Sequence, residues 1–217
     1  MTVEENTKAI LEELGNVKLV SVTKTVDPER INESIRAGST IIGENRIQEF
    51  DEKCESILPC EKHLIGHLQT NKVKRAVELF DVIQSVDSLK VIEEIDRRAR
   101  EIGKVQEVFL QINIGNEPQK FGFETDKIAQ MKKDIQSLKN IHVTGLMCIP
   151  PFLSPEEARP YFRKMKAIFD GMVLENQGNI NLHELSMGMS GDYRVAIEEG
   201  ATMVRVGSAI FGKRDFA

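Results

Sequence analysis

The order of strands and helices that the sequence predicts limits the choice of fold more than any other feature. Eight short runs rich in β-branched residues alternate with amphipathic helical patterns along the 217 residues. Each predicted strand is followed by a helical segment that returns the chain to the starting edge of the sheet, so the strands are expected to run parallel. The predicted strands are Val17–Thr23, Thr40–Gly43, His63–Gly66, Asp81–Val86, Gln106–Ile114, His142–Ile149, Leu182–Ser186 and Thr202–Val206.

Two of the helical segments have features that affect the fold. Ser154 and Glu157 have the spacing of a capping box, with Pro155 in the first turn of the helix that follows. Pro160 lies inside the same pattern and is expected to kink this helix or to delay its start. Residues 2–14 are predicted to form an additional helix before the first strand.

Eight strand–helix units favour a closed (β/α)8 barrel, the TIM barrel, over an open sheet. The length is short for such a barrel, so residues 1–217 are expected to form one domain with an extra N-terminal helix. An open, doubly wound sheet of seven or eight strands is the alternative, because a sequence indicates strands more directly than their closure.

Composition and charge exclude several classes of protein. The net charge of −5 argues against binding to the phosphate backbone of nucleic acids, which requires a basic surface. A hydrophobic content of 41 % excludes intrinsic disorder, and no apolar run is long enough to span a membrane. The charged N-terminus lacks a secretory signal, and three cysteines without a CxxC pair fit neither a disulfide framework nor a zinc cluster. We therefore expect a reduced, cytoplasmic protein without nucleic-acid or membrane partners.

The chemistry of such barrels is located at the carboxyl ends of the strands. The last two loops are rich in small residues: the seventh predicted strand ends in Ser186-Met187-Gly188-Met189-Ser190-Gly191, and Gly207-Ser208 follows the eighth. Small residues let backbone N–H groups approach an anion, and the helices that follow add further donors. These loops are predicted to bind a phosphate group, with simple tight turns as the alternative.

Lys24 and Arg205 are predicted to point into the barrel mouth beside these loops. Strand alternation places Val20, Val22 and Lys24 on one face of the first strand. In the same way it places Met203, Arg205 and Gly207 on one face of the eighth strand. The two strands are neighbours in a closed barrel, and a desolvated lysine near another cation becomes a usable amine nucleophile. The alternative is a strand-end lysine that extends to solvent.

A phosphate-binding loop together with a nucleophilic lysine suggests pyridoxal 5'-phosphate (PLP) held as a Schiff base. Arg205 would then face the nitrogen of the pyridine ring. Because a guanidinium group does not give up its proton, the ring nitrogen would stay unprotonated and PLP would be a weaker electron sink.

Seven segments of the sequence carry long and specific motifs, in order from about residue 17 to the end. They are VSVTK (20–24), IGENRIQEF (42–50), HLIGHLQTNK (63–72), IQSVDS (83–88), QINIGNEPQKFGF (111–123), GLMCIPP (145–151) and LSMGMSGDYRVAIEEGATMVRVGSAIFGKR (185–214). Together these segments resemble the YggS/PROSC family of pyridoxal-phosphate homeostasis proteins.

The resemblance implies a barrel like the N-terminal domain of alanine racemase, PLP as the cofactor, and no established catalytic turnover. By position, Lys24 resembles the Schiff-base lysine of the family, Asn45 a residue that lines the ring, and Arg205 the partner of the pyridine nitrogen. The residues that resemble the phosphate-binding site are Ser186, Met187, Gly188, Ser190, Gly207 and Ser208.

Four residues depart from the family pattern. Lys62 stands where many members have tryptophan, Arg46 where an aromatic residue is common, and Phe121 where a small or polar residue is usual. Ser208 replaces a frequent threonine but keeps the hydroxyl group. The first three positions are expected at the outer mouth, where they affect the choice of ligand or partner.

Three functions compete at this point. The first is a monomeric protein of PLP homeostasis that binds PLP without turnover and has PLP-dependent enzymes as clients. The second is a racemase of the alanine racemase type, which needs a second base that neither Tyr161 nor Tyr193 obviously supplies. The third, suggested by the fold alone, is a phosphosugar aldolase or isomerase that uses Lys24. The first is favoured, because a barrel without the second racemase domain leaves its site open to water.

Overall fold

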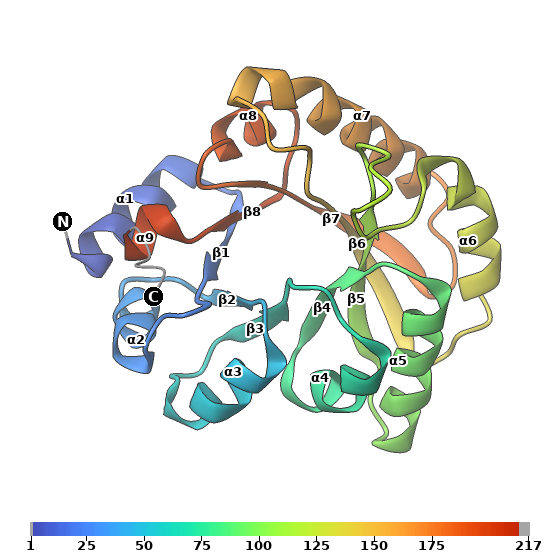
Figure 1. Ribbon diagram of the computed structural model, residues 1–217, viewed down its shortest axis with the longest axis horizontal. Helices are drawn as coiled ribbons and strands as arrows, with labels where there is room; N and C mark the ends of the chain where they lie inside the picture. The colour runs from blue at the N-terminus through green and yellow to red at the C-terminus, as the bar shows by residue number, and fades with distance from the viewer. Residues whose placement is uncertain (1, 213–217) are drawn as a thin grey trace.

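Hydrogen bonds between neighbouring strands close the sheet into a complete barrel. The computed structural model describes residues 2–212, and these contain eight parallel strands in sequence order, with β8 pairing back onto β1 (Figure 1). In this closing pair Lys18 lies opposite Met203, and Val20 lies opposite Arg205. The strands are β1 (Lys18–Val22), β2 (Ile41–Glu44), β3 (Glu61–Leu64), β4 (Val82–Val86), β5 (Gln106–Ile112), β6 (Ile141–Cys148), β7 (Ile180–Met189) and β8 (Met203–Val206). The predicted closed barrel is confirmed, and the open sheet is wrong.

The helices form a ring around the outside of the barrel (Figure 1). They are α1 (Val3–Leu14), α2 (Pro28–Arg36), α3 (Ile47–Lys53), α4 (Val73–Leu79), α5 (Leu89–Glu101), α6 (Ile128–Ile135), α7 (Pro155–Val173), α8 (Tyr193–Glu198) and α9 (Ser208–Phe211), with 3-10 turns η1 (Cys54–Ser56), η2 (Thr70–Lys72) and η3 (Thr125–Lys127). Within residues 2–212, no helix is both long and apolar enough to cross a membrane. Met1 and residues 213–217 of the predicted domain lie outside the described part of the chain.

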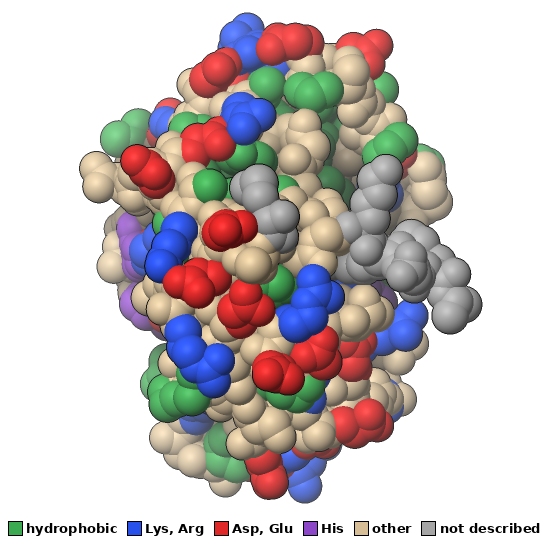
Figure 2. Space-filling view, turned by 90° about the vertical axis from the view of Figure 1, so that its left-hand side faces the viewer, with side chains coloured by type: hydrophobic (Ala, Val, Ile, Leu, Met, Phe, Trp, Pro, Cys, Tyr) green, Lys and Arg blue, Asp and Glu red, His purple; other side chains and the backbone are tan. Residues whose placement is uncertain are grey.

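The predicted N-terminal helix is α1, which begins with a capping box between Thr2 and Glu5. It lies beside α2 and α9 (Figure 1), and the Asn6 side chain donates to the carbonyl of Ile210 at 2.9 Å. Figure 2 shows this side of the molecule, where acidic and basic side chains intermingle. Helix α1 therefore connects the elements that lie on either side of the barrel closure.

Helix α7 is continuous through Pro160. It starts where predicted, with the capping box of Ser154 and Glu157 and with Pro155 in the first turn, so the expected delay of the start is wrong. A proline near the beginning of a helix removes one backbone hydrogen bond. That loss is small beside the burial of side chains such as Phe162 along this 19-residue helix.

Apolar side chains form two separate cores. The larger core fills the space between the strands and the surrounding helices. The smaller core lies inside the barrel and consists of Val20, Ile41, Val82, Phe109, Met147 and Met203. Because side chains alternate along a strand, the residues two positions closer to the carboxyl ends also point inward. This alternation places Val22, Gln84 and Arg205 in the barrel lumen.

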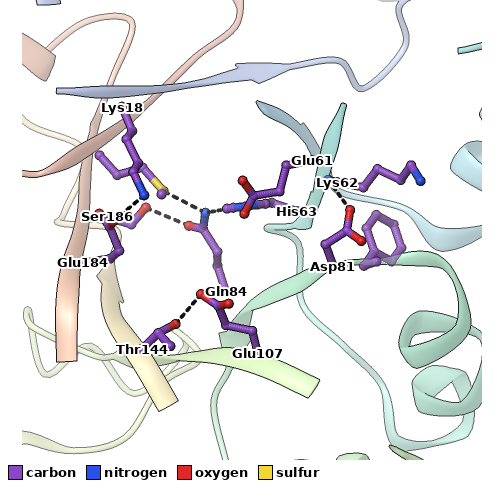
Figure 3. Close-up of polar contacts among 12 residues, drawn as sticks. Lys18, Glu61, Lys62, His63, Asp81, Gln84, Glu107, Thr144, Glu184 and Ser186 are labelled. Carbon is purple, nitrogen blue, oxygen red and sulfur yellow. Dashed lines mark hydrogen bonds and ion pairs between the residues drawn. The ribbon is translucent and has the colours of Figure 1, made fainter. Parts of the chain in front are cut away.

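The amino ends of the strands form a charged floor below the inner core. Lys18 forms an ion pair with Glu184 at 2.6 Å, and this contact is the main reason why the pKa of Lys18 is raised. Glu61 and Glu107 add smaller electrostatic contributions to the same shift. Figure 3 shows these side chains converging from different strands. The lumen therefore has charged groups at both ends, with the apolar layer between them.

Candidate functional site at the barrel mouth

The carboxyl ends of the strands bring most of the predicted site residues to one mouth of the barrel. Lys24 lies two residues after β1, Asn45 follows β2 directly, and Arg205 lies within β8. Ser190 and Gly207 immediately follow β7 and β8. Because all of these strands run parallel, their carboxyl ends open on the same side.

Lys24 is half-buried and lies in a turn that side chains of α3 hold in place. The next residue, Thr25, has φ of 60°, a left-handed conformation that is unfavourable for a β-branched residue. The N–H of Thr25 donates to the carboxylate of Glu49, and the ammonium group of Lys53 donates to the carbonyl of Thr23 at 2.9 Å. The backbone on both sides of Lys24 is therefore fixed by neighbours from the helix.

A buried ion pair lies beneath this turn. Lys53 pairs with Glu44 at 2.7 Å and with Glu49 at 3.0 Å, and it also donates to the carbonyl of Val26 at 3.2 Å. Burial raises the pKa of the Glu44 carboxyl, while Lys53 and the hydroxyl of Thr23 act in the opposite direction. Such a pair has to offset the loss of hydration of both charges, so its contacts with the turn are an essential part of its stability.

Arg205 is buried inside the lumen, with only 4 % of its surface exposed. Its Nη1 donates to Ser186 Oγ at 2.7 Å, and its Nη2 donates to the carbonyl of Cys148 at 2.8 Å. Burial lowers the pKa of the guanidinium group, but arginine does not lose its proton in proteins. A guanidinium group has five N–H donors, so Arg205 keeps donors for a ligand. The prediction that this side chain points into the barrel is confirmed.

β7 extends three residues beyond its predicted end, into the predicted phosphate loop. The strand continues to Met189, so Met187, Gly188 and Met189 of the predicted loop are strand residues, and the predicted strand end at Ser186 is wrong. The register with β8 shifts between Ser186 and Met189, and Gly188 has φ of 91°, so the strand bends without ending. Ser186 contacts Arg205 in the lumen, whereas Met187 is fully buried in the outer core.

Small residues form the rim beside β7 and β8. Ser190 Oγ accepts a hydrogen bond from the N–H of Gly207 at 3.1 Å, which joins the two loops. Ser208 is exposed and begins the short helix α9. A Cβ atom at Gly188 would lie 2.6 Å from the Cβ atom of Ala196, so the close packing of α8 on this strand requires glycine. Hydroxyl groups and accessible backbone of this kind can bind an anion.

Asn45 places a buried amide oxygen at the mouth. Within the described residues this Oδ1 atom has no hydrogen-bond partner. The backbone of Asn45 also packs closely on Gly66, where a Cβ atom would lie 2.2 Å from the Asn45 carbonyl oxygen. A buried acceptor without a donor is costly, so this oxygen suits a ligand that donates a hydrogen bond.

The outer mouth contains a histidine with two close neighbours. His67 Nδ1 lies 2.8 Å from Asp87 Oδ2, and the ring stacks on Phe121 with 3.5 Å between centroids. Phe121 is 52 % exposed and is one of the residues that depart from the family pattern. His63, four residues earlier, is buried and has other partners, so the two histidines do not act as a pair.

The cysteines of the described chain are free thiols. Burial raises the pKa of Cys60 to about 11 and that of Cys148 to about 12, so both thiols stay protonated at neutral pH. Protonated thiols are poor nucleophiles, so neither Cys60 nor Cys148 is a candidate nucleophile.

Sequence analysis missed the side chains that support the site. Lys53 lies three residues after Phe50 on the buried face of α3, and a lysine within an apolar helical stripe was the available signal. Gln84 lies two residues after Val82, on the lumen face of β4. A glutamine within a strand that is buried throughout was a comparable signal.

The family model described as "Alanine racemase, N-terminal domain" matches residues 2–215. The alanine racemase of Clostridium difficile 630 has a similar fold, with a TM-score of 0.76 over 98 % of this chain and 55 % of that enzyme. Its sequence identity of 16 % limits this similarity to the fold. The chain belongs to the family of alanine racemase N-terminal domains.

More similar relatives define the protein within that family. The relative from Aquifex aeolicus (strain VF5) is 45 % identical over 92 % of this chain and 88 % of its own length, and the one from Escherichia coli (strain K12) is 34 % identical over 93 % and 87 %. Both are named pyridoxal phosphate homeostasis protein. PipY of Synechococcus elongatus PCC7942, solved with PLP bound, has a TM-score of 0.89 at 33 % identity and covers 97 % of this chain and 100 % of its own. The chain is a member of the pyridoxal phosphate homeostasis proteins.

Proposed function

We propose that this protein binds PLP and acts in PLP homeostasis, with Lys24 as the attachment point through a Schiff base. The observation that carries the proposal is a half-buried lysine and a fully buried arginine, Arg205, at one barrel mouth. PipY, a structure with nearly the same fold, was solved with PLP bound. PLP supplies an aldehyde for a primary amine and a ring that withdraws electrons.

The residues at the mouth fit PLP in their donor and acceptor chemistry. Arg205 is a permanent donor for the pyridine nitrogen, and the Asn45 oxygen, which has no partner among residues 2–212, is an acceptor for a donor group on the ring. The hydroxyl groups of Ser190 and Ser208 are available to the phosphate group, together with the backbone around Gly207.

The strand residues of β7 contribute in a different way. In this proposal Ser186 acts through its hydrogen bond with Arg205. Met187 contributes its backbone only, because its side chain packs in the outer core. Gly188 provides the bend that brings the β7 loop beside Gly207.

The proposal includes binding without catalytic turnover. A pyridine nitrogen that accepts a hydrogen bond from Arg205 stays unprotonated, which makes PLP a weak electron sink. A weak electron sink disfavours chemistry that needs a carbanion. The Tyr193 hydroxyl donates to Glu13 of α1 at 2.9 Å, and Tyr161 packs against the outer core. These contacts occupy the two tyrosines of the chain, which supports a binding protein over a racemase with a tyrosine base.

The remaining parts of the proposal concern the cellular setting. We place the protein in the cytoplasm as a monomer that exchanges PLP with PLP-dependent enzymes, which fits its free thiols and its net charge of −5. Light scattering after gel filtration measures the molar mass in solution and so tests whether the protein is a monomer. Transfer of PLP to an added PLP-free enzyme tests the exchange.

The attachment point is tested by absorption spectroscopy before and after borohydride reduction, followed by mapping of the modified peptide. Lys24→Ala is expected to abolish the trapped adduct and to weaken PLP binding roughly tenfold or more, with residual binding through the phosphate contacts. Lys120→Ala is the matched control, because Lys120 lies near the mouth and donates to the carbonyl of Pro150. It should trap PLP like the parent protein.

Two results would contradict the proposal at different levels. Undiminished trapping in Lys24→Ala would mean that another amine carries PLP. A parent protein that takes up no added PLP would overturn PLP binding itself and favour a sugar phosphate as the ligand.

A further inference from the structure

A continuous set of hydrogen bonds crosses the barrel lumen from β8 to β3. Arg205 Nη1 lies 2.7 Å from Ser186 Oγ, and Ser186 Oγ lies 2.7 Å from Gln84 Oε1. Gln84 Nε2 lies 2.6 Å from His63 Nδ1, and His63 Nε2 lies 2.8 Å from Glu61 Oε1. Figure 3 shows the part of this set that runs from Ser186 to Glu61. We call these five residues the lumen network.

The direction of every hydrogen bond in the lumen network follows from Arg205. A guanidinium group only donates, so Ser186 Oγ accepts from it and the Ser186 hydroxyl donates to Gln84 Oε1. The amide nitrogen of Gln84 then faces His63 and donates to Nδ1. Nδ1 therefore carries no proton, and the ring proton of His63 is on Nε2, where it is donated to Glu61.

Two further contacts fix the orientation of the middle of the network. The second amide hydrogen of Gln84 is directed to the sulfur of Met203, at 3.2 Å. The His63 ring meets the Phe109 ring edge-on, with 6.2 Å between centroids and an angle of 83°. Rotating the amide of Gln84 by half a turn would oppose its oxygen to the Met203 sulfur, which cannot donate, and would leave the Ser186 hydroxyl without an acceptor. One orientation is therefore favoured.

One bond of the lumen network joins two strands that are not paired with each other. In the barrel β7 is paired with β6 and β8, and β4 is paired with β3 and β5, so the bond from Ser186 to Gln84 spans the lumen. Gln84 and Ser186 are fully buried, and His63 is 1 % exposed. Glu61 is the end that reaches solvent, with 46 % of its side chain exposed. Hydrogen bonds inside a low-dielectric lumen are stronger than in water, so this set holds its buried end group, Arg205, in one geometry.

We infer that Gln84, His63 and Glu61 are positioning residues for Arg205, which hold its guanidinium group for the pyridine ring of PLP without touching that ring. The inference rests on the proposed function and deepens it. Among the residues that the structure describes, Arg205 donates hydrogen bonds to Ser186 Oγ and to the Cys148 carbonyl. Without the acceptor that Gln84 provides, the Ser186 hydroxyl is free to turn and no longer presents one fixed lone pair to Arg205.

The first test needs no cofactor. Long-range ¹H–¹⁵N NMR spectra of the PLP-free protein report which nitrogen of His63 carries the proton. The expected result is a neutral ring protonated at Nε2. A ring protonated at Nδ1, or at both nitrogens at neutral pH, would overturn the direction of the network and with it the inference.

The second test compares two buried glutamines. Gln84→Met removes the centre of the network, and Gln106→Met makes the same change in β5, where Gln106 is fully buried and its amide donates only to the backbone carbonyls of Phe80, Asp81 and Glu107. Both variants are expected to lose stability. Only Gln84→Met should raise the dissociation constant of PLP, by about tenfold, and shift the absorption maximum of bound PLP. It should also broaden the Arg205 guanidinium signals in the PLP-free protein.

The outcomes separate the inference from the proposed function. Equal effects of the two variants on PLP binding, or no effect of either, would overturn positioning while leaving PLP binding by the parent protein intact. If Gln84→Met does not fold, Gln84→Glu takes its place, because it keeps an acceptor for Ser186, and its other oxygen can accept from a His63 ring that is protonated on both nitrogens. Gln84→Glu should retain the affinity within about threefold, and a loss as large as that of an Arg205→Ala variant would contradict the inference.

Discussion

Replacing Lys53 with methionine tests the buried ion pair beneath the Lys24 turn. The side chains of Lys53 and Glu44 are 9 % and 0 % exposed, so the substitution leaves a buried carboxylate without its partner cation. Breaking a buried pair in this way costs about 3–5 kcal/mol of unfolding free energy. Methionine keeps the volume of the lysine stem, so the loss reports the charge and its hydrogen bonds rather than a cavity.

The pH dependence of this loss follows from Glu44. Burial already raises its pKa in the folded protein, and Lys53 acts against that rise. Without Lys53 the folded-state pKa moves further above the unfolded one, and the folded protein binds more protons than the unfolded chain between these two values. Stability of the variant therefore falls as pH rises through this range. The loss relative to the parent should be larger near pH 8 than near pH 5.

Urea unfolding of the parent and variant at several pH values measures both effects. Lys132→Met is the matched control, because Lys132 is similarly buried but its partner Glu175 is 70 % exposed and can return to water. It should cost less than about 1 kcal/mol. Adding Glu44→Gln to Lys53→Met should restore most of the loss. Equal losses for Lys53→Met and Lys132→Met, or a loss that does not change with pH, would refute this account of the pair.

Two further predictions concern packing and are checked by the same urea measurements. Gly188→Ala should lower the free energy of unfolding by about 2–4 kcal/mol, because the backbone has φ of 91° and the new Cβ atom would lie 2.6 Å from the Cβ atom of Ala196. Gly191→Ala is the control: its Cβ atom would meet nothing within 4 Å, so its stability should stay within about 0.5 kcal/mol of the parent. Equal costs would show that the strand bend does not depend on glycine. Phe162→Ala, at a fully buried position of α7, should lower the free energy of unfolding by about 3–5 kcal/mol. Phe152→Ala, at a fully exposed position, should change it very little. A small loss for Phe162→Ala would mean that α7 contributes little to the core.

The architecture could be predicted from the sequence because its signal is repeated along the whole chain. Alternating strand and helix patterns require parallel strands, and eight of them with no spare length favour closure. The end of β7 was harder to predict, since a glycine can mark a bend or bulge within a strand as well as a turn that ends it. Here Gly188 bends the strand while the pairing with β8 resumes at Met189, and only the geometry of the sheet decides between these outcomes.

The site was predictable where it depends on alternation within one strand. The lumen placement of Arg205 follows from its spacing to Met203 in β8. The hydrogen bonds that continue from Arg205 through Ser186 could not be predicted from such spacing. The bond between Ser186 and Gln84 joins residues from opposite sides of the barrel. Distances across a lumen depend on strand number and tilt, which no local sequence pattern encodes.

The pairing of β1 with β8 has a consequence for the synthesis of this protein. Translation releases β1 early and β8 late, so β1 and β7 each present an unpaired backbone edge until residues 203–206 leave the ribosome. Bringing Lys18 opposite Met203 also closes a loop that includes most of the polypeptide, a step with a high entropic cost. Translation products that stop before Met203 should therefore aggregate through these edges rather than persist as partial barrels.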